Sequence, residues 1–555
     1  MVFNPADLPE LWAPCMMANP MECHCICASE VPHTTRLFAT YLDDFARLGD
    51  FYAHPPAEEG IVTAARQVRH DPGTRRTVVE VLREQNLRLG ADGATARNLD
   101  RLAAGASAVV TGQQVGLFTG PSYSIYKALT AIRAAAQLTQ RGTEAVPVFW
   151  LAGEDHDLAE VNHCFWLSRS GLARFENPTD NAAGRRVGEV QLGEGIRAVV
   201  QAATALLDGP WAEEIGRALE ESYRSEETLG SAFGKLMARL FAGKGIILLD
   251  PLDARLHRLA APVYRRALEE TAVLTHELLA RGKALDRRGY HAQAKVTERS
   301  TLLFMNIAGR RLPVRQRSAG FVVGSAEFSA ADLLEAIERA PEEFSANVLL
   351  RPVVQDALLP TAAYVGGPAE VAYFAQAEVL YRRLLGRMPA VLPRANFTLV
   401  EPHIARLLKK YGLEPRDVLR GRQHLRARME REFLSKALAG RFDAGEKAIR
   451  KLLTGLRRPL GKLDRTLLGA LDTAERKMLY QFLSVRGKAA RAENFRTGVL
   501  DAHERQLTES LYPHHGLQER TLCFLPLLAR HGQELLGELA ERAGIGATQH
   551  QVLFL

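Results

Sequence analysis

The order of elements expected between residues 107 and 157 constrains this fold more than any other feature of the sequence. A short apolar run at 107–111 is followed by a glycine-rich stretch at 112–121, an Ala- and Leu-rich segment at 123–140 and a second apolar run at 146–152. This succession of strand, tight turn, helix and strand predicts a βαβ unit with parallel strands. Its polar residues then follow the carboxyl ends of the strands, where open α/β sheets bind ligands.

Similar patterns elsewhere predict an α/β core with insertions. Residues 34–100 have helical periodicity, 245–250 form an apolar run that ends in an acid, and 346–400 return to strand and helix signals. The shorter, more polar strand-like pieces of 290–328 indicate an insertion. We predict a leader at 1–30, a first core part with a helical N-terminal region at 31–285 and an inserted domain at 286–345. A second core part follows at 346–401, then a helical coiled coil at 402–510 and a C-terminal segment that returns to the core at 511–555.

Apolar residues spaced by three and four between Ile449 and Val485 predict an antiparallel coiled-coil hairpin, with a kink or break at Pro459. Residues 401–500 also hold 24 Lys and Arg against 11 Asp and Glu, a net charge of +13. The whole chain has a net charge of +7, so the rest, with 47 against 53, is at −6. Solvated basic residues are common on long helices and aromatic residues are few, so we do not expect a nucleic-acid partner.

The composition excludes other classes of protein. No run approaches about 18 apolar residues, so we expect no membrane span. The N-terminus lacks the basic and then apolar pattern of a secretory signal. Six cysteines among 555 residues are sparse and typical of a cytoplasmic protein rather than of a disulfide framework.

Four of the cysteines lie within the first thirty residues, and two interpretations of them stay open. Thiolates at Cys23, Cys25 and Cys27 could bind a soft metal, although structural zinc sites usually use ligand pairs separated by a loop. The other interpretation is an unstructured or atypical leader, or translation that starts at a later methionine.

The glycine-rich turn after the first strand is a candidate anion site. Glycines let backbone amides approach a ligand, and the helix after Pro121 directs N–H groups and its positive dipole end toward the turn. Lys127 adds a positive charge one turn into the helix. The alternative is a tight turn that needs glycine for its geometry. The candidate binding residues here are Gly112, Gln113, Gln114, Gly116 and Gly120.

The acidic cluster after the second strand is the candidate for proton transfer. Glu154, Asp155 and His156 follow that strand directly, and a histidine beside carboxylates can act as acid or base. The alternative is a helix N-cap at Asp155 or Asp157 beside a solvated loop. The cluster could also bind a divalent ion, although two adjacent carboxylates on an extended chain cannot both face one point. We therefore assign no metal ligand, and a metal requirement stays open. With Lys127, these three residues are the candidate catalytic groups.

Two further polar sets follow the later strand signals. Gly-Gly-Pro at 366–368 before a helix repeats the logic of an anion site, and its alternative is an ordinary loop and helix start. The candidate binding residues from this part of the chain are Arg351, Gln355, Asp356, Tyr364, Gly366, Gly367, Glu370, Tyr373 and Arg394.

Several long motifs resemble the bacillithiol biosynthesis cysteine-adding enzymes, the BshC family. They include Thr111-Gly-Gln-Gln-Val-Gly-Leu-Phe-Thr-Gly-Pro121, Val146-Pro-Val-Phe-Trp-Leu-Ala-Gly-Glu-Asp-His-Asp157, Arg351-Pro-Val-Val-Gln-Asp356, Leu359-Pro-Thr-Ala-Ala-Tyr-Val-Gly-Gly-Pro368 and Leu517-Gln-Glu-Arg520. The resemblance extends over about residues 34 to 540 and is too long to be chance.

The resemblance implies a Rossmann-like core with inserted connecting domains, a C-terminal α-helical coiled coil, and homodimers. It also implies the last step of bacillithiol synthesis, in which the carboxyl of L-cysteine is joined to the amine of glucosaminyl malate. Since forming an amide in water is uphill, the carboxylate needs activation, and the related class I aminoacyl-tRNA synthetase fold suggests ATP and a cysteinyl adenylate.

One departure from those relatives leaves the activation route open. Where they have His-x-Gly-His, this chain has Tyr123-Ser-Ile-Tyr126, and no Lys-Met-Ser-Lys-Ser-like loop is present. Lys127 and Arg394 could supply positive charge instead, and Tyr123 and Tyr126 count among the candidate nucleotide-binding residues. A nucleotide-binding coiled-coil scaffold or sensor without catalysis, and an RNA-binding synthetase relative, are the competing interpretations.

Overall fold

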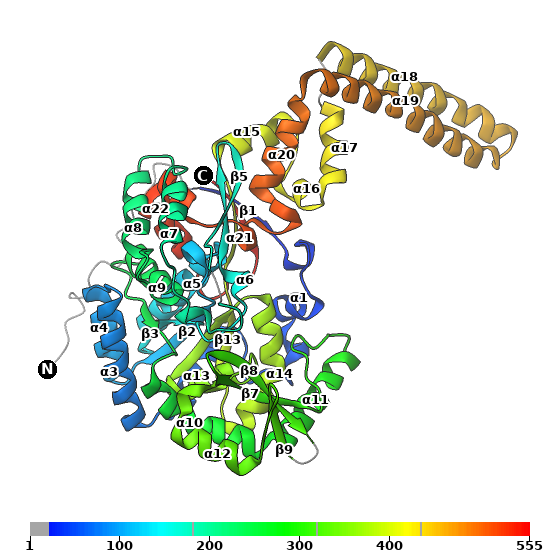
Figure 1. Ribbon diagram of the computed structural model, residues 1–555. Helices are drawn as coiled ribbons and strands as arrows, with labels where there is room; N and C mark the ends of the chain where they lie inside the picture. Colours follow the sequence, from blue (N-terminus) through cyan, green and yellow to red (C-terminus); the bar gives the residue numbers. More distant parts are fainter. Residues whose placement is uncertain (1–20, 180–181, 318–319, 433, 435) are drawn as a thin grey trace. The chain divides into compact units, whose positions relative to one another are not determined.

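A computed structural model describes residues 21–555, except 180, 181, 318, 319, 433 and 435. The described chain divides into two compact units. The first comprises residues 25–397 and 519–551, and the second comprises 21–24, 398–518 and 552–555. Figure 1 shows the helices and strands of both units.

A parallel five-stranded sheet forms the centre of the first unit. Its strands are ordered β13-β12-β2-β3-β6, so the direction of the crossovers reverses between β2 and β12. Their bounds are β2 Ser107–Gln113, β3 Ala145–Leu151, β6 Ile247–Leu249, β12 Thr361–Gly366 and β13 Ala390–Pro393. The α/β class and the Rossmann-like core are therefore confirmed, and the βαβ unit predicted at 107–157 is β2, a helix and β3.

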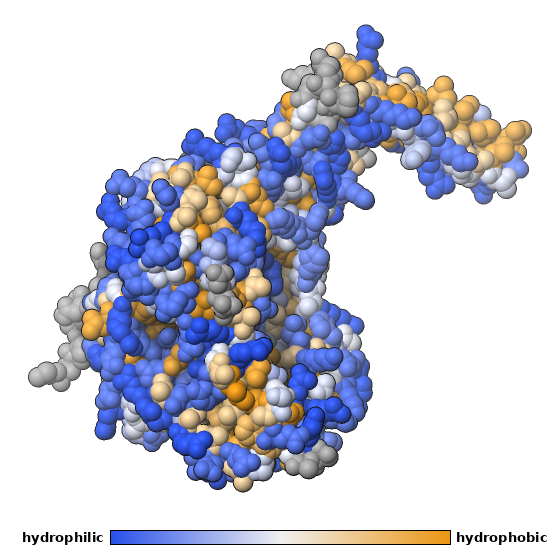
Figure 2. Space-filling view, in the orientation of Figure 1, coloured by the Kyte–Doolittle hydropathy of each residue, from blue (hydrophilic) through white to orange (hydrophobic). Residues whose placement is uncertain are grey.

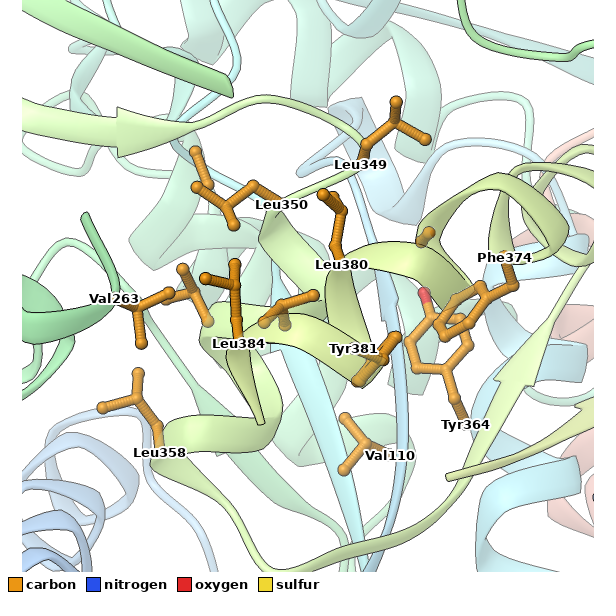
Figure 3. Close-up of a cluster of buried hydrophobic side chains, with 14 of the residues drawn as sticks. Val110, Val263, Leu349, Leu350, Leu358, Tyr364, Phe374, Leu380, Tyr381 and Leu384 are labelled. Atoms are coloured by element: carbon orange, nitrogen blue, oxygen red, sulfur yellow. The ribbon is translucent and has the colours of Figure 1, made fainter. Parts of the chain in front are cut away.

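Helices cover both faces of this sheet because side chains alternate along each strand. Val109 packs with one hydrophobic cluster and its neighbour Val110 with the other. The cluster of Val109 includes residues of α2 (Glu58–Gln67) and α5 (Tyr123–Gln140). The cluster of Val110 includes residues of α1 Arg36–Asp43, α3 Pro72–Arg88, α4 Gly93–Ala103, α10 Ala254–Glu269, α13 Arg351–Leu358 and α14 Pro368–Leu384. Figure 3 shows how α13 and α14 direct leucines and aromatic rings into this second cluster.

Two insertions extend the core. The first, between β3 and β6, consists of α6 Leu158–Val161, the antiparallel pair β4 His163–Ser168 and β5 Gly171–Glu176, α7 Gly195–Thr204, α8 Ala212–Ser222 and α9 Leu229–Leu240. The second, between α10 and α13, contains α11 Thr271–Arg287, α12 Ala330–Arg339 and the antiparallel sheet of β7 Ser300–Ile307, β8 Arg310–Arg317, β9 Gly320–Val323, β10 Ala326–Phe328 and β11 Phe344–Ala346. This second insertion contains the strand-like pieces that indicated one in the sequence.

The second unit is mostly helical and contains the predicted hairpin. Its helices are α15 Pro402–Lys410, α16 Pro415–Leu419, α17 Arg422–Glu432, α18 Lys436–Leu463, α19 Leu467–Thr497 and α20 Val499–Leu511. Ion pairs of Arg450 with Glu475 and of Arg486 with Asp443 show that α18 and α19 are antiparallel. The coiled-coil prediction is confirmed.

The break expected at Pro459 is not there, because α18 continues through this residue to Leu463. A proline removes one helical hydrogen bond, and a partly exposed helix can lose it without ending. The chain reverses instead after Leu463, where the Asp464 carboxylate accepts a hydrogen bond from the Thr466 amide at 2.8 Å.

The N-terminal prediction is corrected for residues 21–30. Glu22–Ile26 form strand β1 at the edge of a sheet ordered β1-β15-β14, and main-chain pairing gives this segment a fixed structure. The predicted leader from 1 to 20, with Cys15, lies outside the described residues. The remaining elements are β14 Asn396–Val400, α21 Gln518–Thr521, α22 Leu525–Arg542 and β15 His550–Phe554. Among the helices of the described residues, none has the length and apolar character to cross a membrane.

Candidate active site

A cavity of about 590 Å³ lies at the carboxyl ends of β2, β3 and β12, where the sheet order reverses. Open α/β sheets bind ligands at this kind of position. Fourteen of the twenty candidate residues line it: Gly112, Gln113, Gln114, Tyr123, Lys127, Glu154, Asp155, His156, Arg351, Tyr364, Gly367, Glu370, Tyr373 and Arg394. The other six, Gly116, Gly120, Tyr126, Gln355, Asp356 and Gly366, do not.

Gly116 and Gly120 belong to a buried loop rather than to the cavity wall. Phe118, between them, is fully buried, and its ring packs against Tyr223 with centroids 4.9 Å apart. The Tyr223 hydroxyl also accepts a hydrogen bond from the Phe118 amide at 2.8 Å. The loop therefore fills the core, which corrects the expectation that these glycines hold an anion. Gly112 differs, because it lines the cavity and a Cβ there would lie 2.9 Å from the carbonyl oxygen of Trp150 on β3.

The start of α5 is also closed to a ligand. The Ser122 amide and hydroxyl both donate to the carbonyl of Leu522, and the Tyr126 amide donates back to Ser122. Tyr126 is fully buried between the rings of Phe397 and Phe524. Only Tyr123 of this tyrosine pair reaches the cavity.

Gln355 and Asp356 support the wall from behind. The Gln355 side chain accepts a hydrogen bond from Arg351 at 3.1 Å and donates one to Asp356 at 2.9 Å. The second Asp356 oxygen accepts from the Tyr381 hydroxyl at 2.5 Å. Burial raises the pKa of Asp356, while these hydrogen bonds oppose the rise. Both side chains therefore position Arg351 from within the core.

A buried ion pair between Lys127 and Glu370 joins α5 to α14. The Lys127 ammonium also donates to the carbonyl of Gly112 at 2.6 Å and to Gln113 at 3.0 Å. These three partners account for its three N–H donors. Burial lowers the pKa of Lys127 although Glu370 opposes this. The ammonium therefore holds the protein together and is not free to bind a phosphate, which corrects its expected role.

Glu370 is the partner of Lys127 in this ion pair. One oxygen caps α14 by accepting from the Gly367 amide at 2.8 Å, and the other accepts from the Tyr364 hydroxyl at 2.5 Å. Burial raises the pKa of Glu370, but the charge of Lys127 and the Gly367 amide outweigh this and the net shift is downward. Since the carboxylate already occupies the helix start, Gly367 lines the cavity without offering its amide.

Two arginines in the wall are tied to specific partners. Arg351 donates to the hydroxyls of Tyr364 at 3.2 Å and Tyr373 at 3.0 Å. Arg394 makes a bidentate pair with Glu519 at 2.7 and 3.0 Å, and both side chains are buried. Glu519 was not among the candidates, and only the returning C-terminal segment brings it here.

Glu154 is the carboxylate in this cavity whose hydrogen bonding is incomplete. It is 8% exposed, and its Oε1 is buried without a hydrogen-bond partner. Burial raises its pKa to about 7, with Arg311, Arg186 and Arg351 opposing the rise and Asp250 adding to it. A carboxyl with a pKa near neutrality can accept or release a proton under physiological conditions.

Its neighbours Asp155 and His156 are held by other groups. Asp155 accepts hydrogen bonds from Gln114 and from the His156 amide, both at 2.7 Å. Burial raises the pKa of Asp155, but these bonds and the Arg311 charge make the net shift downward. Arg311 donates to Nδ1 of His156 at 3.1 Å, so this nitrogen is an acceptor and the ring proton resides on Nε2.

The lining also includes residues that are not among the candidates from the sequence. Arg311 and Phe304 come from the second insertion, and the guanidinium lies 3.7 Å from the ring centroid. Lys295 lies in the segment before β7, and Arg520 lies on α21. Arg311 lies near the start of β8, just after the Ala308-Gly309 turn, and Arg520 ends a motif used for the family resemblance, but neither signal indicates which strand end the residue reaches.

The lining is cationic within a unit whose sequence suggested an acidic body. It contains six Lys and Arg residues against three carboxylates. Lys295 and Arg520 are exposed, and neither has an ion-pair partner in the part of the chain that the structure describes. Within the same described ranges, no group of three or more His, Cys, Asp or Glu side chains is arranged to hold a metal ion. The arrangement suits anionic small molecules beside a proton acceptor.

Comparison with known proteins gives concordant matches over the chain. Residues 21–395 match the family model described as "Bacillithiol biosynthesis BshC, N-terminal Rossmann-like domain", and residues 397–555 match "Bacillithiol biosynthesis BshC, C-terminal coiled-coil domain". Proteins called "Putative cysteine ligase BshC" from Koribacter versatilis and Solibacter usitatus are 43% and 40% identical, covering 95% and 96% of this chain and 99% and 100% of their own. One of the same name from Salinibacter ruber is 34% identical, covering 93% of this chain and 96% of its own.

The Lys127–Glu370 pair yields a stability prediction. Glu370→Gln leaves a buried ammonium without its counter-charge, so we expect a loss of about 3–5 kcal/mol in the free energy of unfolding. Lys127→Met in the same chain removes that charge, and we expect the double variant to regain part of the loss. Urea unfolding of the three proteins measures this.

Glu144→Gln is the matched control, since Glu144 pairs with Arg101 at the surface. Its loss is expected to stay under about 1 kcal/mol. If Glu370→Gln is no more destabilising than Glu144→Gln, the buried pair does not have the structural role assigned to it.

Proposed function

Because this chain belongs to the BshC family, we propose that it is a ligase that joins the carboxyl of L-cysteine to the amine of glucosaminyl malate. This is the last step of bacillithiol synthesis, and we place it in the cytoplasm with ATP as the activating co-substrate. The observation that supports the proposal is the Glu154 carboxyl, whose Oε1 has no hydrogen-bond partner, in a cavity with a cationic lining. Amide formation from a phosphate-activated carboxyl and an amine that carries malate carboxylates needs a proton acceptor and positive charge together.

Glu154 is the proton acceptor in this proposal. Asp155 is occupied by two donors, and Nδ1 of His156 is occupied by Arg311. Glu154 keeps an oxygen without a partner and has a pKa raised by burial to about 7. Asp155 and His156 then shape the wall beside it.

The reaction balances as follows. The amine nitrogen of glucosaminyl malate attacks the carbonyl carbon of activated cysteine, and the new C–N bond forms. The C–O bond to the phosphate leaving group breaks, and the leaving group keeps the electron pair of this bond. The proton of the attacking nitrogen passes to Glu154. ATP supplies the activation, and the leaving group is AMP or phosphate according to which phosphorus the cysteine carboxylate attacks.

Lys295 and Arg520 are the groups that we assign to the anionic parts of the substrates. Both line the cavity and neither is neutralised by a carboxylate among the described residues. Lys127 and Arg394 are already paired within the protein. The malate carboxylates and the nucleotide phosphates share the chemistry that such cations recognise.

Incubation of the protein with L-cysteine, glucosaminyl malate and ATP is expected to give bacillithiol, detected by mass spectrometry. AMP as the co-product indicates adenylation, and ADP indicates phosphorylation. Absence of bacillithiol with any nucleotide would rule out the ligase and favour a nucleotide-binding scaffold.

Glu154→Gln is expected to lower kcat about 10²- to 10⁴-fold, because the amide cannot accept the proton. A general base acts when deprotonated, so wild-type kcat should rise with pH through about 7 and then level off. Glu335→Gln, on the surface of α12, is the control and should keep both rate and profile. An unchanged kcat in Glu154→Gln would remove this residue from the mechanism.

Lys295→Gln and Arg520→Gln are each expected to raise a KM about tenfold with little change in kcat. Separate titrations of glucosaminyl malate and of ATP assign each cation to the substrate whose KM changes. Lys283→Gln on α11 is the control, since Lys283 is exposed and does not line the cavity. Unchanged KM values for both substrates would contradict the assignment.

We also propose that the protein is a homodimer that uses the α18–α19 hairpin. The hairpin exposes Leu452, Leu463, Tyr480 and Val485, with more than half of each residue accessible. Figure 2 shows hydrophobic surface along this hairpin. Exposed apolar residues on one element favour association.

Replacing Leu452 and Tyr480 by serine is expected to shift the sedimentation equilibrium from dimer to monomer. Leu87→Ser is the control, because Leu87 on α3 is also highly exposed and is not part of the hairpin. A wild-type protein that sediments as a monomer at all accessible concentrations would overturn the dimer.

A further inference from the structure

A second buried group with an unpaired atom lies behind Glu154. His257, on α10, has a side chain that is 1% exposed and does not line the cavity. Its Nε2 lies 3.7 Å from Oε1 of Glu154, and both of these atoms are buried without a hydrogen-bond partner. Buried polar atoms without partners are rare in folded proteins, and two of them facing each other call for an explanation.

The protonation of His257 follows from its other contacts. Burial and then Arg186 lower the pKa of His257 to about 4, so the imidazole is neutral at physiological pH. The backbone of Phe344 acts in the opposite direction and raises the pKa of His257. We assign the proton of the neutral ring to Nδ1, because the Tyr264 hydroxyl lies 3.4 Å from this nitrogen while Nε2 has no hydrogen-bond partner. Nε2 is therefore a lone-pair acceptor aimed at Glu154.

A lone pair of this kind complements only the protonated form of Glu154. In the carboxylate form two acceptors face each other, and the 3.7 Å between them is longer than a hydrogen bond. When Glu154 takes up a proton, its O–H can donate to Nε2, and a side-chain shift of about 1 Å gives an ordinary hydrogen bond.

We propose that His257 is a positioning residue, whose Nε2 accepts the O–H of Glu154 once this carboxylate has taken the proton of the attacking amine. This rests on the proposed ligase reaction. The hydrogen bond stabilises the product of the proton transfer and fixes the carboxyl group toward the cavity. No bond to carbon changes in this step, and the proton stays on Glu154.

The other charged groups around the pair come from several elements. Arg311 of β8, Arg186 of the first insertion and Arg351 of α13 favour the charged form of Glu154. Asp250, after β6, opposes it, and Asp253, at the start of α10, raises the pKa of His257. All of these groups stay in place in the experiment below, so a change in the titration of Glu154 reports on His257.

His257→Leu removes the acceptor, and His257→Gln keeps an acceptor oxygen at about the place of Nε2. We expect His257→Leu to lower kcat about 10- to 100-fold with both KM values within twofold of wild type. The rise of kcat with pH should move to lower pH by about one unit, because protonated Glu154 loses its partner. His257→Gln should restore part of kcat and most of the profile. His276→Leu on α11, an exposed histidine away from the cavity, is the control.

A spectroscopic measurement separates this inference from the ligase proposal. Infrared difference spectra between the wild type and Glu154→Gln isolate the C=O stretch of protonated Glu154 in the free protein. We expect His257→Leu to shift this band and its titration midpoint even if no bacillithiol is formed. An unchanged band and pH profile in His257→Leu would overturn the role of His257, as would equal losses of kcat in the Leu and Gln variants together with lowered thermal stability.

Discussion

The Lys127 ammonium connects the two strand ends between which the cavity opens. It takes the Gly112 carbonyl after β2 as one acceptor and the Glu370 carboxylate after β12 as another. Glu370 in turn caps α14 and orients Tyr364, whose hydroxyl meets Arg351. A buried ion pair stabilises a fold only when the other donors and acceptors of both side chains also have partners. Here both the Lys127 ammonium and the Glu370 carboxylate have such partners. The shape of the wall from Gly112 to Arg351 depends on this single contact.

The sheet order explains why the reactive groups gather beside that contact. Crossovers run in opposite directions from β2 and β12, so the ends of these neighbouring strands are left open to a ligand. Glu154 at the end of β3 is one strand away. The second insertion contributes Arg311 and Phe304 to the cavity wall, and burial raises the pKa of the Glu154 carboxyl to about 7 although the Arg311 charge opposes the rise.

Much of this arrangement could be predicted because it is encoded locally. Strand, turn and helix patterns identify β2, α5 and β3, and residues directly after parallel strands must share one edge of the sheet. Glu154 and Tyr364 could be found in this way. Gly116 and Gly120 misled because a glycine-rich loop looks the same whether it binds an anion or holds a phenyl ring such as Phe118 in the core.

The remaining residues depend on contacts between distant parts of the chain. Nothing in the local sequence of α10 indicates that Nε2 of His257 lies 3.7 Å from Oε1 of Glu154. Arg311 and Arg520 reach the cavity from an insertion and from the C-terminal segment. The position of Glu519 in the sequence affects when the protein can fold during translation. Glu519 supplies the counter-charge of buried Arg394, although 124 residues lie between them in the sequence. During synthesis the Rossmann-like unit therefore emerges with an uncompensated charge and an open wall, and it can close only after the whole helical unit has been translated.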